Sequence, residues 1–375
     1  MKTILIAAAL AMVFTLLGTR LAIGILVKNG YGQFIREDGP TAHKTKRGTP
    51  TMGGLVIILA TVAAYFMAHL INWRPPSVSG LLVLYLFVGC GLIGFLDDWT
   101  KISKQRSLGL DSKGKLIGQT LVAVSFGFMA FQFPDEDGRT PASMAISFLR
   151  DIPWLDFARF GVVIGTILAL IWIVLLVTAA SNAVNLTDGL DGLATGACTM
   201  VFAAYALVNL WQYNQTCGDL STAGPRCYEV RDPHDLAVVS LALAGACFGF
   251  LWWNTKPAKI FMGDSGSLSL GGALAGLAIT TRTELLLVIL AGLMVIITLS
   301  VILQVTYFKT TKRLAVRRGD PDPKGKRLFK MAPLQHHFEM IGWGESTIVV
   351  RFWIISGIFV ALGLGIFYGE WVSGL

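Results

Sequence analysis

Residues 78–98 read VSGLLVLYLFVGCGLIGFLDD, an apolar run that ends in two adjacent carboxylates. A helix needs about 20 apolar residues to cross a hydrocarbon core of about 30 Å, so this stretch is long enough to span a membrane. The whole chain of 375 residues has the same character, because 54% of it is hydrophobic, 14% is charged and the mean hydropathy is +0.63. A soluble domain carries about 25% charged residues and disorder needs low hydrophobicity, so both classes are excluded.

Nine further apolar stretches of this kind occur, and the alternating strands of an outer-membrane barrel are absent. The sequence predicts an all-α, polytopic membrane protein with about ten transmembrane helices. We expect these helices near residues 3–27, 51–71, 78–96, 116–133, 160–181, 190–209, 236–253, 265–281, 285–308 and 352–370. Since no repeat of fixed period and no low-complexity tract divides the chain, residues 1–375 are expected to form a single integral-membrane domain.

The distribution of Lys and Arg predicts the orientation. The connections on one side are 28–50, 97–115, 182–189, 254–264 and 309–351. They contain 22 Lys and Arg residues, against 8 in the opposite set. Basic residues mark the cytoplasmic side, so the first set should face the cytoplasm and both termini should be periplasmic. The net charge of +8 is then explained by topology, and no nucleic-acid partner is expected.

The N-terminus allows a second interpretation, because its first twenty residues resemble a signal peptide. The apolar stretch resumes after Arg20 and continues to Val27, which is too long for a typical signal peptide. Cleavage would also leave nine spans and spoil the charge pattern, so a first transmembrane helix is favoured.

The five cysteines fall into two groups. Cys90, Cys198 and Cys247 lie in apolar spans, where simple packing is expected. Cys217 and Cys227 lie in a connection assigned to the outside, where a disulfide is plausible and would fit an oxidising compartment. No zinc-binding spacing of Cys and His is present.

Ionisable residues inside the spans are limited to Arg20 and His69, which argues against an ion-coupled transporter. The acidic residues instead lie at span ends. Asp97 and Asp98 close the stretch quoted above. Neighbouring helix positions differ by about 100°, so one carboxylate could face a metal or a nucleophile while the other braces a loop. A solvated pair is the alternative. A negative pair at a helix C-terminus is unfavourable, so a divalent cation or the Lys101–Lys115 cluster should compensate it.

A second polar segment, residues 181–193, lies between two spans. Asp188 and Asp191 are three residues apart and Asn185 lies one turn earlier on the same side. Clusters of this kind suit divalent metals that prefer oxygen ligands, phosphate-linked magnesium and ribose hydroxyls. Helix capping by Thr187 or Asp188 is the alternative.

Three more segments carry polar residues on the same side. Asp264 begins an apolar helix, so it either caps that helix or holds Mg²⁺ against a phosphate at the helix N-terminus, with Lys256 and Lys259 nearby. His336 and His337 are either a surface pair or ligands of a diphosphate. Residues 46–54 either start a helix or bind an anion. No GxxxxGK[ST] motif is present, which disfavours ATP-driven chemistry.

Taken together, the five segments supply carboxylates for Mg²⁺, basic residues for phosphates and apolar walls for a lipid chain. These side chains suit phosphoryl transfer from a soluble, magnesium-bound nucleotide to a phosphate held in the membrane.

The same segments resemble a known family, the polyprenyl-phosphate N-acetylhexosamine-1-phosphate transferases, and within it the phospho-N-acetylmuramoyl-pentapeptide transferase branch. The matching pieces are GTPTMGG (48–54), LDD (96–98), NLTDGLDG (185–192), FMGDSGS (261–267) and APLQHHFE (332–339). The resemblance implies that undecaprenyl phosphate attacks UDP-N-acetylmuramoyl-pentapeptide, so that UMP leaves and lipid I forms at the cytoplasmic face of the bacterial inner membrane. It implies Mg²⁺ as cofactor and a possible homodimer.

The resemblance also implies roles for individual residues. Asp264 resembles the Mg²⁺ ligand, with Asp188 as a second candidate ligand. Asp97 resembles the residue that binds or deprotonates the lipid phosphate, with Asp98 beside it. The residues that resemble a uridine and diphosphate pocket are Asn185, Asp188, Gly189, Leu190, Asp191, Asn254 and Phe261. Those expected to line the same site or to meet phosphates, sugar or peptide are Lys46, Thr51, Lys101, Lys113, His336 and His337.

The chain departs from the family pattern where three consecutive histidines are usual, because Gln335 replaces the first. Gln cannot carry a proton, so His336 becomes the candidate general acid. Two other functions remain open at this point. One is a sister enzyme that uses UDP-N-acetylglucosamine, and the other is a polytopic transporter or flippase.

Overall fold

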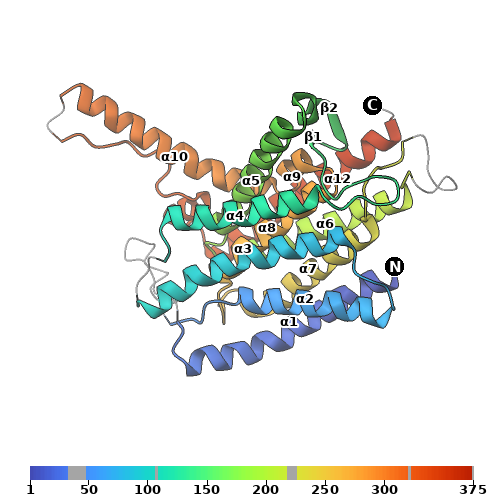
Figure 1. Ribbon diagram of the computed structural model, residues 1–375. Helices are drawn as coiled ribbons and strands as arrows, with labels where there is room; N and C mark the ends of the chain where they lie inside the picture. Colours follow the sequence, from blue (N-terminus) through green and yellow to red (C-terminus); the bar gives the residue numbers. More distant parts are fainter. Residues whose placement is uncertain (33–47, 106–108, 218–225, 320–321, 374–375) are drawn as a thin grey trace.

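The computed structural model describes residues 1–32, 48–105, 109–217, 226–319 and 322–373. Most of these residues are helical and run roughly along one direction of an elongated bundle (Figure 1). The α-helices are α1 Lys2–Lys28, α2 Gly54–Ile71, α3 Val78–Ser103, α4 Ser112–Ala130, α5 Val162–Thr187, α6 Leu193–Asn214, α7 Pro233–Asn254, α8 Gly263–Thr280, α9 Glu284–Leu290, α10 Gly292–Arg317, α11 Leu334–Met340 and α12 Glu345–Ser373. The predicted helical class is therefore confirmed.

Eight of these helices are long and apolar enough to cross a membrane: α1, α2, α3, α5, α6, α7, α10 and α12. Two other predicted spans correspond to α4 and α8, which have 19 and 18 residues but are less apolar. The polytopic character of the chain is confirmed, while the count of ten stays a prediction.

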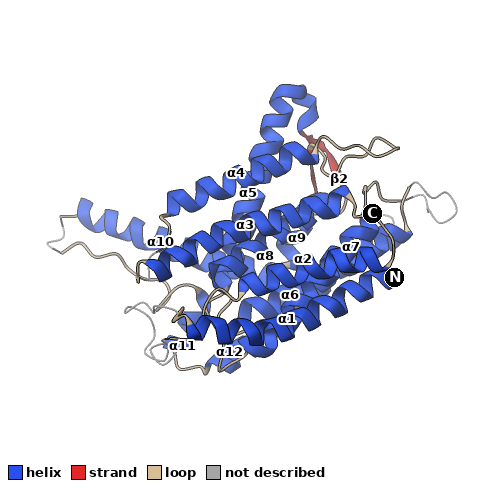
Figure 2. Ribbon diagram, turned by 60° about the horizontal axis from the view of Figure 1, so that its bottom comes forward, coloured by secondary structure: helices blue, strands red, loops and turns tan. Residues whose placement is uncertain are grey.

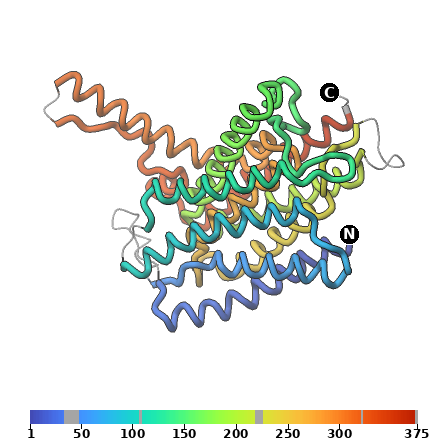
Figure 3. Tube along the Cα trace, in the orientation of Figure 1, coloured from blue at the N-terminus to red at the C-terminus, as the bar shows by residue number. Residues whose placement is uncertain are grey.

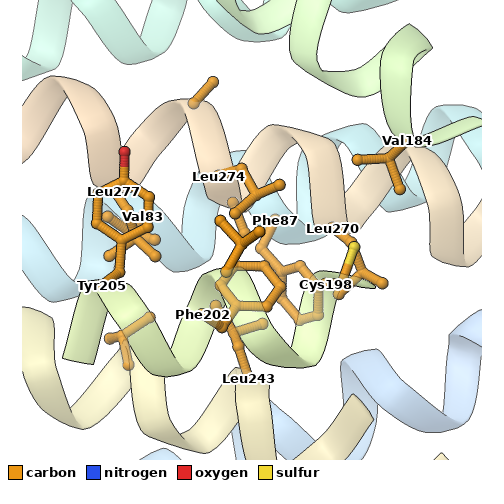
Figure 4. Close-up of a cluster of buried hydrophobic side chains, with 14 of the residues drawn as sticks. Val83, Phe87, Val184, Cys198, Phe202, Tyr205, Leu243, Leu270, Leu274 and Leu277 are labelled. Carbon is orange, nitrogen blue, oxygen red and sulfur yellow. The ribbon is translucent and has the colours of Figure 1, made fainter. Parts of the chain in front are cut away.

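Helix α8 forms the centre of the bundle. Every residue from Ser265 to Thr280 is buried, and the helix contacts α2, α3, α5, α6, α7 and α9. Its Gly, Ala and Ser residues give it low hydropathy but let neighbouring backbones approach closely, as is usual where helices pack in membranes. Figure 4 shows Leu270, Leu274 and Leu277 of α8 packed with Phe202 of α6 and Phe87 of α3.

Both ends of the described chain lie at the same end of the bundle, as the tube in Figure 3 shows. A small β-hairpin not predicted from the sequence lies near that end, formed by β1 Ala145–Ser147 and β2 Asp151–Asp156 and followed by the 3₁₀ helix η2 Phe157–Phe160. The predicted disulfide between Cys217 and Cys227 is confirmed, with Cα atoms 4.7 Å apart. The three other cysteines are buried, as expected.

The predicted helix ends are wrong in two places that matter for the site. Helix α3 continues to Ser103 and helix α5 to Thr187, so residues expected in loops are helical. A local ion pair between Lys101 and Asp97, one turn earlier, supports the extension of α3. The extension of α5 is held from outside the helix, since Asn185 donates to Asp264 Oδ1 and Gln335 donates to the Leu186 carbonyl.

The span predicted at 285–308 is also wrong in detail, because the chain breaks at Ala291 into α9 and α10. Gly292 begins α10, and a Cβ atom there would lie 2.4 Å from the Phe359 ring of α12. The break therefore lies where an aromatic side chain presses against the backbone.

Candidate active site

Three carboxylates from two helices meet at the end of the bundle opposite the chain termini. Asp97 and Asp98 end the apolar part of α3, and Asp264 lies in the first turn of α8. One oxygen from each of the three lies within 4.8 Å of the others. Asp97 and Asp98 are buried, while the Asp264 side chain is 15% exposed. The fold thus brings Asp264 next to Asp97 and Asp98, which lie far from it in the sequence.

Glycines make this meeting possible. A Cβ atom on Gly94 of α3 would lie 2.0 Å from the Asp264 carbonyl oxygen, and one on Gly54 of α2 would lie 2.2 Å from the Gly266 Cα. Only a residue without a side chain permits these backbones to approach so closely. The starts of α2 and α8 and the end of α3 therefore converge on one point.

Two lysines neutralise much of the negative charge. Lys101 Nζ lies 2.6 Å from Asp97 Oδ2 and 3.0 Å from Asp264 Oδ2. Lys115 Nζ, from the first turn of α4, lies 2.5 Å from Asp264 Oδ2 and 3.2 Å from Asp97 Oδ1. Both ammonium groups thus contact Asp97 as well as Asp264. The lysine cluster expected to compensate the acidic helix end is present.

Asp98 has a bracing role. Its Oδ1 accepts the Asp264 backbone N–H at 3.1 Å and its Oδ2 accepts the Ser265 N–H at 2.9 Å. The start of α8 is thereby capped by a side chain from another helix. Asp264 itself does not cap the helix, so the capping alternative is wrong. Two of the N–H groups at this helix start are taken by Asp98 rather than open to a phosphate, while the role of Asp264 as a Mg²⁺ ligand stays a prediction.

The polar segment after α5 reaches the same place. Asn185 Nδ2 donates to Asp264 Oδ1 and to Ser267 Oγ, both at 2.9 Å. Asp188 follows the end of α5, and burial, then the charges of Asp264 and Asp98, raises the pKa of its carboxyl to about 8. Asp188 is not among the three carboxylates that cluster, so its role as a metal ligand stays a prediction.

Electrostatics distinguish Asp264 from Asp188. Asp264 Oδ2 lies 3.0 Å from Lys101 Nζ and 2.5 Å from Lys115 Nζ, and these two positive charges favour its ionised form. The ionised form is the one that binds a cation.

Helix α11 brings the histidine segment to the end of α5. Figure 2 shows α11 at the end of the bundle away from the termini. His336 Nδ1 lies 2.6 Å from Glu339 Oε2. Gln335 is buried and its Nε2 donates to the Leu186 carbonyl, so it anchors the segment to the end of α5. His337 Nδ1 accepts the Lys330 N–H at 3.2 Å. A Cβ atom on Gly189 would lie 3.0 Å from His336 Nε2, so His336 borders the Asp188 segment.

Several predicted ligands are held by other parts of the protein. Asn254 is buried, where its Oδ1 accepts from the Thr195 hydroxyl and its Nδ2 donates to the Ile260 carbonyl. Asp191 Oδ2 accepts the Ala258 N–H. Leu190 is a core residue. The Asp191 bond holds the loop between α5 and α6, and the Asn254 bonds hold the end of α7. Direct contact of these side chains with substrate stays a prediction.

The other predicted residues are placed as follows. Thr51 is buried next to the start of α8, and a Cβ atom on Gly263 would lie 3.0 Å from its hydroxyl. Phe261 is half-buried and its N–H donates to the Pro50 carbonyl. Lys113 is exposed and makes no ion pair with any carboxylate in the described ranges. Lys46 lies outside the described residues.

Sequence reasoning gave too little weight to Lys115 and missed Ser267. Lys115 entered only as the end of a basic cluster, although it lies nearer the carboxylates than the selected Lys113 does. Helical periodicity from Ser112 would have helped, since Lys113 and Lys115 point about 200° apart.

The residues present fit a divalent cation. The cluster offers carboxylate oxygens, which Mg²⁺ prefers. Its oxygen atoms also converge, since one from each carboxylate lies within 4.8 Å of the others.

Comparison with known proteins assigns the chain to a family. Residues 80–282 match the family described as glycosyl transferase family 4, and residues 46–58 match the phospho-N-acetylmuramoyl-pentapeptide-transferase signature 1. The chain is 62% identical over 374 residues to the phospho-N-acetylmuramoyl-pentapeptide-transferase of Cutibacterium acnes, with 100% of each chain covered. It is 63% identical over 376 residues to that of Kineococcus radiotolerans, with the same coverage, and 60% identical over 378 residues to that of an Arthrobacter species, with 99% of each covered. Full-length similarity at this level, together with the signature at the start of α2, shows that the chain belongs to the phospho-N-acetylmuramoyl-pentapeptide-transferase family of membrane enzymes.

Proposed function

We propose that this transferase moves phospho-N-acetylmuramoyl-pentapeptide from UDP-N-acetylmuramoyl-pentapeptide to undecaprenyl phosphate, with Mg²⁺, and so forms lipid I and UMP in peptidoglycan synthesis. The observation that carries this proposal is the meeting of Asp97, Asp264, Lys101 and Lys115 at one end of an apolar bundle. Such a site can hold phosphates of a soluble donor next to a lipid acceptor.

Each residue of the site would have a separate role. Asp264 would hold the cation, and Asp188 is the further ligand expected from the sequence. When bound, the cation would neutralise negative charge on the phosphoryl group that is transferred. Lys101 and Lys115, drawn toward phosphate oxygens, would orient donor and acceptor in line. Asp98 keeps the start of α8, and therefore Asp264, in place.

The proposed reaction requires little proton transfer by residues of the site. A phosphate monoester has a second pKa near 6, so the acceptor is mostly ionised at neutral pH. Asp97 would hold any remaining proton of the acceptor, because its Oδ1 is oriented by the Leu110 N–H at 2.7 Å. His336, oriented by Glu339, would donate a hydrogen bond to the sugar diphosphate or the departing UMP.

The orientation in the membrane belongs to the same proposal. We infer ten spans, with the site facing the cytoplasm and the termini facing the periplasm. Two observations support this orientation. The Lys and Arg residues gather in the connections on the site side. A disulfide fits an oxidising compartment such as the periplasm. The Cys217–Cys227 disulfide lies on the side of the termini, near the C-terminal end of α12, since Arg150 donates to the Cys227 carbonyl and forms an ion pair with Glu370.

A UMP-release assay tests the reaction. Purified protein with undecaprenyl phosphate and UDP-N-acetylmuramoyl-pentapeptide should release UMP with Mg²⁺ and release none with EDTA. Asp264→Asn should lower the rate by at least about a hundredfold, while Asp137→Asn, an exposed carboxylate at the other end, should keep it. Full activity in EDTA or in Asp264→Asn would contradict the proposal. Faster turnover of UDP-N-acetylglucosamine would indicate the sister reaction instead.

A further inference from the structure

Helix α10 leaves the bundle and projects beyond it, as the orange helix in Figure 1 shows. Its buried residues are Gly292, Leu293, Met294, Ile297 and Ser300, all in its first half. None of the residues from Val301 to Gly319 is buried. The second half of this helix therefore has no protein partner on most of its surface.

A return segment, residues 322–330, is fastened along the projecting helix. Gln304 Oε1 accepts the N–H groups of Leu328 and Phe329 at 3.0 and 2.9 Å, and its Nε2 donates to the Phe329 carbonyl. Further out, the Thr311 hydroxyl accepts the Lys326 N–H at 2.8 Å. We call residues 309–319, which are the end of α10 and the two residues after it, together with this return segment the basic arm. These contacts hold it in a defined shape.

The basic arm gathers positive charge with little internal compensation. Its described basic residues are Lys309, Lys312, Arg313, Arg317, Arg318, Lys324, Lys326, Arg327 and Lys330. Its one described carboxylate, Asp322, pairs with Lys324. The other basic residues of the arm form no ion pair with the carboxylates of the described chain. Packing like charges side by side is unfavourable, so an anionic partner outside the chain would offset the repulsion.

The apolar part of the same helix fixes where that partner lies. Ile302, Leu303, Val305 and Phe308 are exposed and directly precede the arm. In a membrane protein such side chains contact lipid tails. A helix rises about 1.5 Å per residue, so Lys312 lies about 15 Å further along the helix than Ile302. Where the apolar residues contact lipid tails, the basic residues that follow them reach toward the headgroups. Leu314 and Leu328, exposed among the charges, suit insertion at this interface.

We propose that the basic arm is a binding site for anionic phospholipid headgroups of the surrounding bilayer. Clusters of Lys and Arg next to the end of a transmembrane helix attract anionic lipids in this way. The proposal is independent of the catalytic chemistry, since it rests on the charge and placement of the arm alone.

Native mass spectrometry of the full-length protein tests this site. The detergent-solubilised protein is titrated with dioleoyl-phosphatidylglycerol and with dioleoyl-phosphatidylcholine. The unaltered protein should retain phosphatidylglycerol at least about fivefold more tightly, and added salt should weaken this preference. The triple variant Lys312→Gln, Arg313→Gln, Arg327→Gln should lose the preference. Since all three side chains are exposed, its thermal unfolding should match that of the unaltered protein.

A matched triple variant provides the control. Lys2→Gln, Arg74→Gln, Arg159→Gln removes the same charge from exposed positions at the opposite end and should keep the preference. An unchanged preference in the arm variant, or none in the unaltered protein, would overturn the proposal. Arm-dependent binding of poly-glutamate without any lipid preference would also overturn it, in favour of an acidic protein partner.

Discussion

At the scale of single residues, the site is a balance of charges in a buried place. Lys115 Nζ lies 2.5 Å from Asp264 Oδ2, and Lys101 Nζ lies 3.0 Å from the same oxygen. A cation that binds Asp264 must compete with these ammonium groups, because each lowers the negative potential at the carboxylate. In the absence of substrate the two lysines therefore weaken metal binding. When a substrate is present, the same lysines can bind its phosphate groups.

Removing one lysine should separate these two effects. We predict that Lys115→Gln binds Mn²⁺ about tenfold more tightly, a change of about 1.4 kcal/mol, and releases UMP more slowly. Electron paramagnetic resonance of Mn²⁺ measures the affinity without substrate. Lys113→Gln removes the same charge from an exposed position and should change the affinity less than about twofold. Weaker Mn²⁺ binding in Lys115→Gln would show that the lysine does not compete with the metal.

At the scale of helices, close backbone contacts carry the geometry. Gly94 allows α3 to press against the start of α8, where an added Cβ atom would lie 2.0 Å from the Asp264 carbonyl oxygen. Since that atom belongs to the backbone, it can yield only if α8 itself moves.

We therefore predict that Gly94→Ala lowers the stability of the protein by about 1 to 3 kcal/mol, as overpacking does, and lowers UMP release as Asp264 is displaced. Thermal unfolding and the release assay measure the two effects. Gly24→Ala, in α1, is the matched control, because its Cβ atom would meet nothing within 4 Å. Wild-type stability and activity in Gly94→Ala would mean that the contact is not needed.

The start of α9 gives a pH-dependent contact at the other end of the bundle. Glu284 is buried, and its Oε2 accepts the N–H and the hydroxyl of Ser147 on β1 at 2.7 and 2.9 Å. Burial raises the pKa of Glu284 from its usual value to about 7, although the bonds from Ser147 lower it in part. The folded state therefore holds a proton that the unfolded chain releases at lower pH.

Because this pKa is raised on folding, the stabilisation by the proton is complete below about pH 4.5 and is lost as the pH rises through 7. We predict that Glu284→Gln, which imitates the protonated form, removes a pH-dependent contribution on the order of 2 to 3 kcal/mol. Thermal unfolding between pH 5 and pH 8 should show a flatter profile for the variant. Parallel profiles for the two proteins would contradict the assignment.

At the scale of the whole molecule, the sequence predicted the features that depend on long patterns. Apolar runs placed the helices, and the pair Cys217 and Cys227 predicted the disulfide. The expectation that Asp97 and Asp264 meet came from span ends on a common side, and the structure does bring these two carboxylates together.

Features that depend on tertiary contacts could not be predicted. The extension of α5 to Thr187 and the cap that Asp98 provides for α8 arise from neighbours distant in the sequence. The same holds for the β1–β2 hairpin, which Glu284 ties to α9. Apolar periodicity does not carry this information.

The central claim is that one divalent ion binds where α3, α5 and α8 meet. Oxidative cleavage by Fe²⁺ and ascorbate tests it most directly, since bound iron cuts the nearby backbone and mass spectrometry maps the cuts. We predict cuts near Asp97, Asp188 and Asp264 together, suppressed by excess Mg²⁺ and absent in Asp264→Asn. Cuts confined to the His336 segment, or cuts that Mg²⁺ does not suppress, would contradict the account.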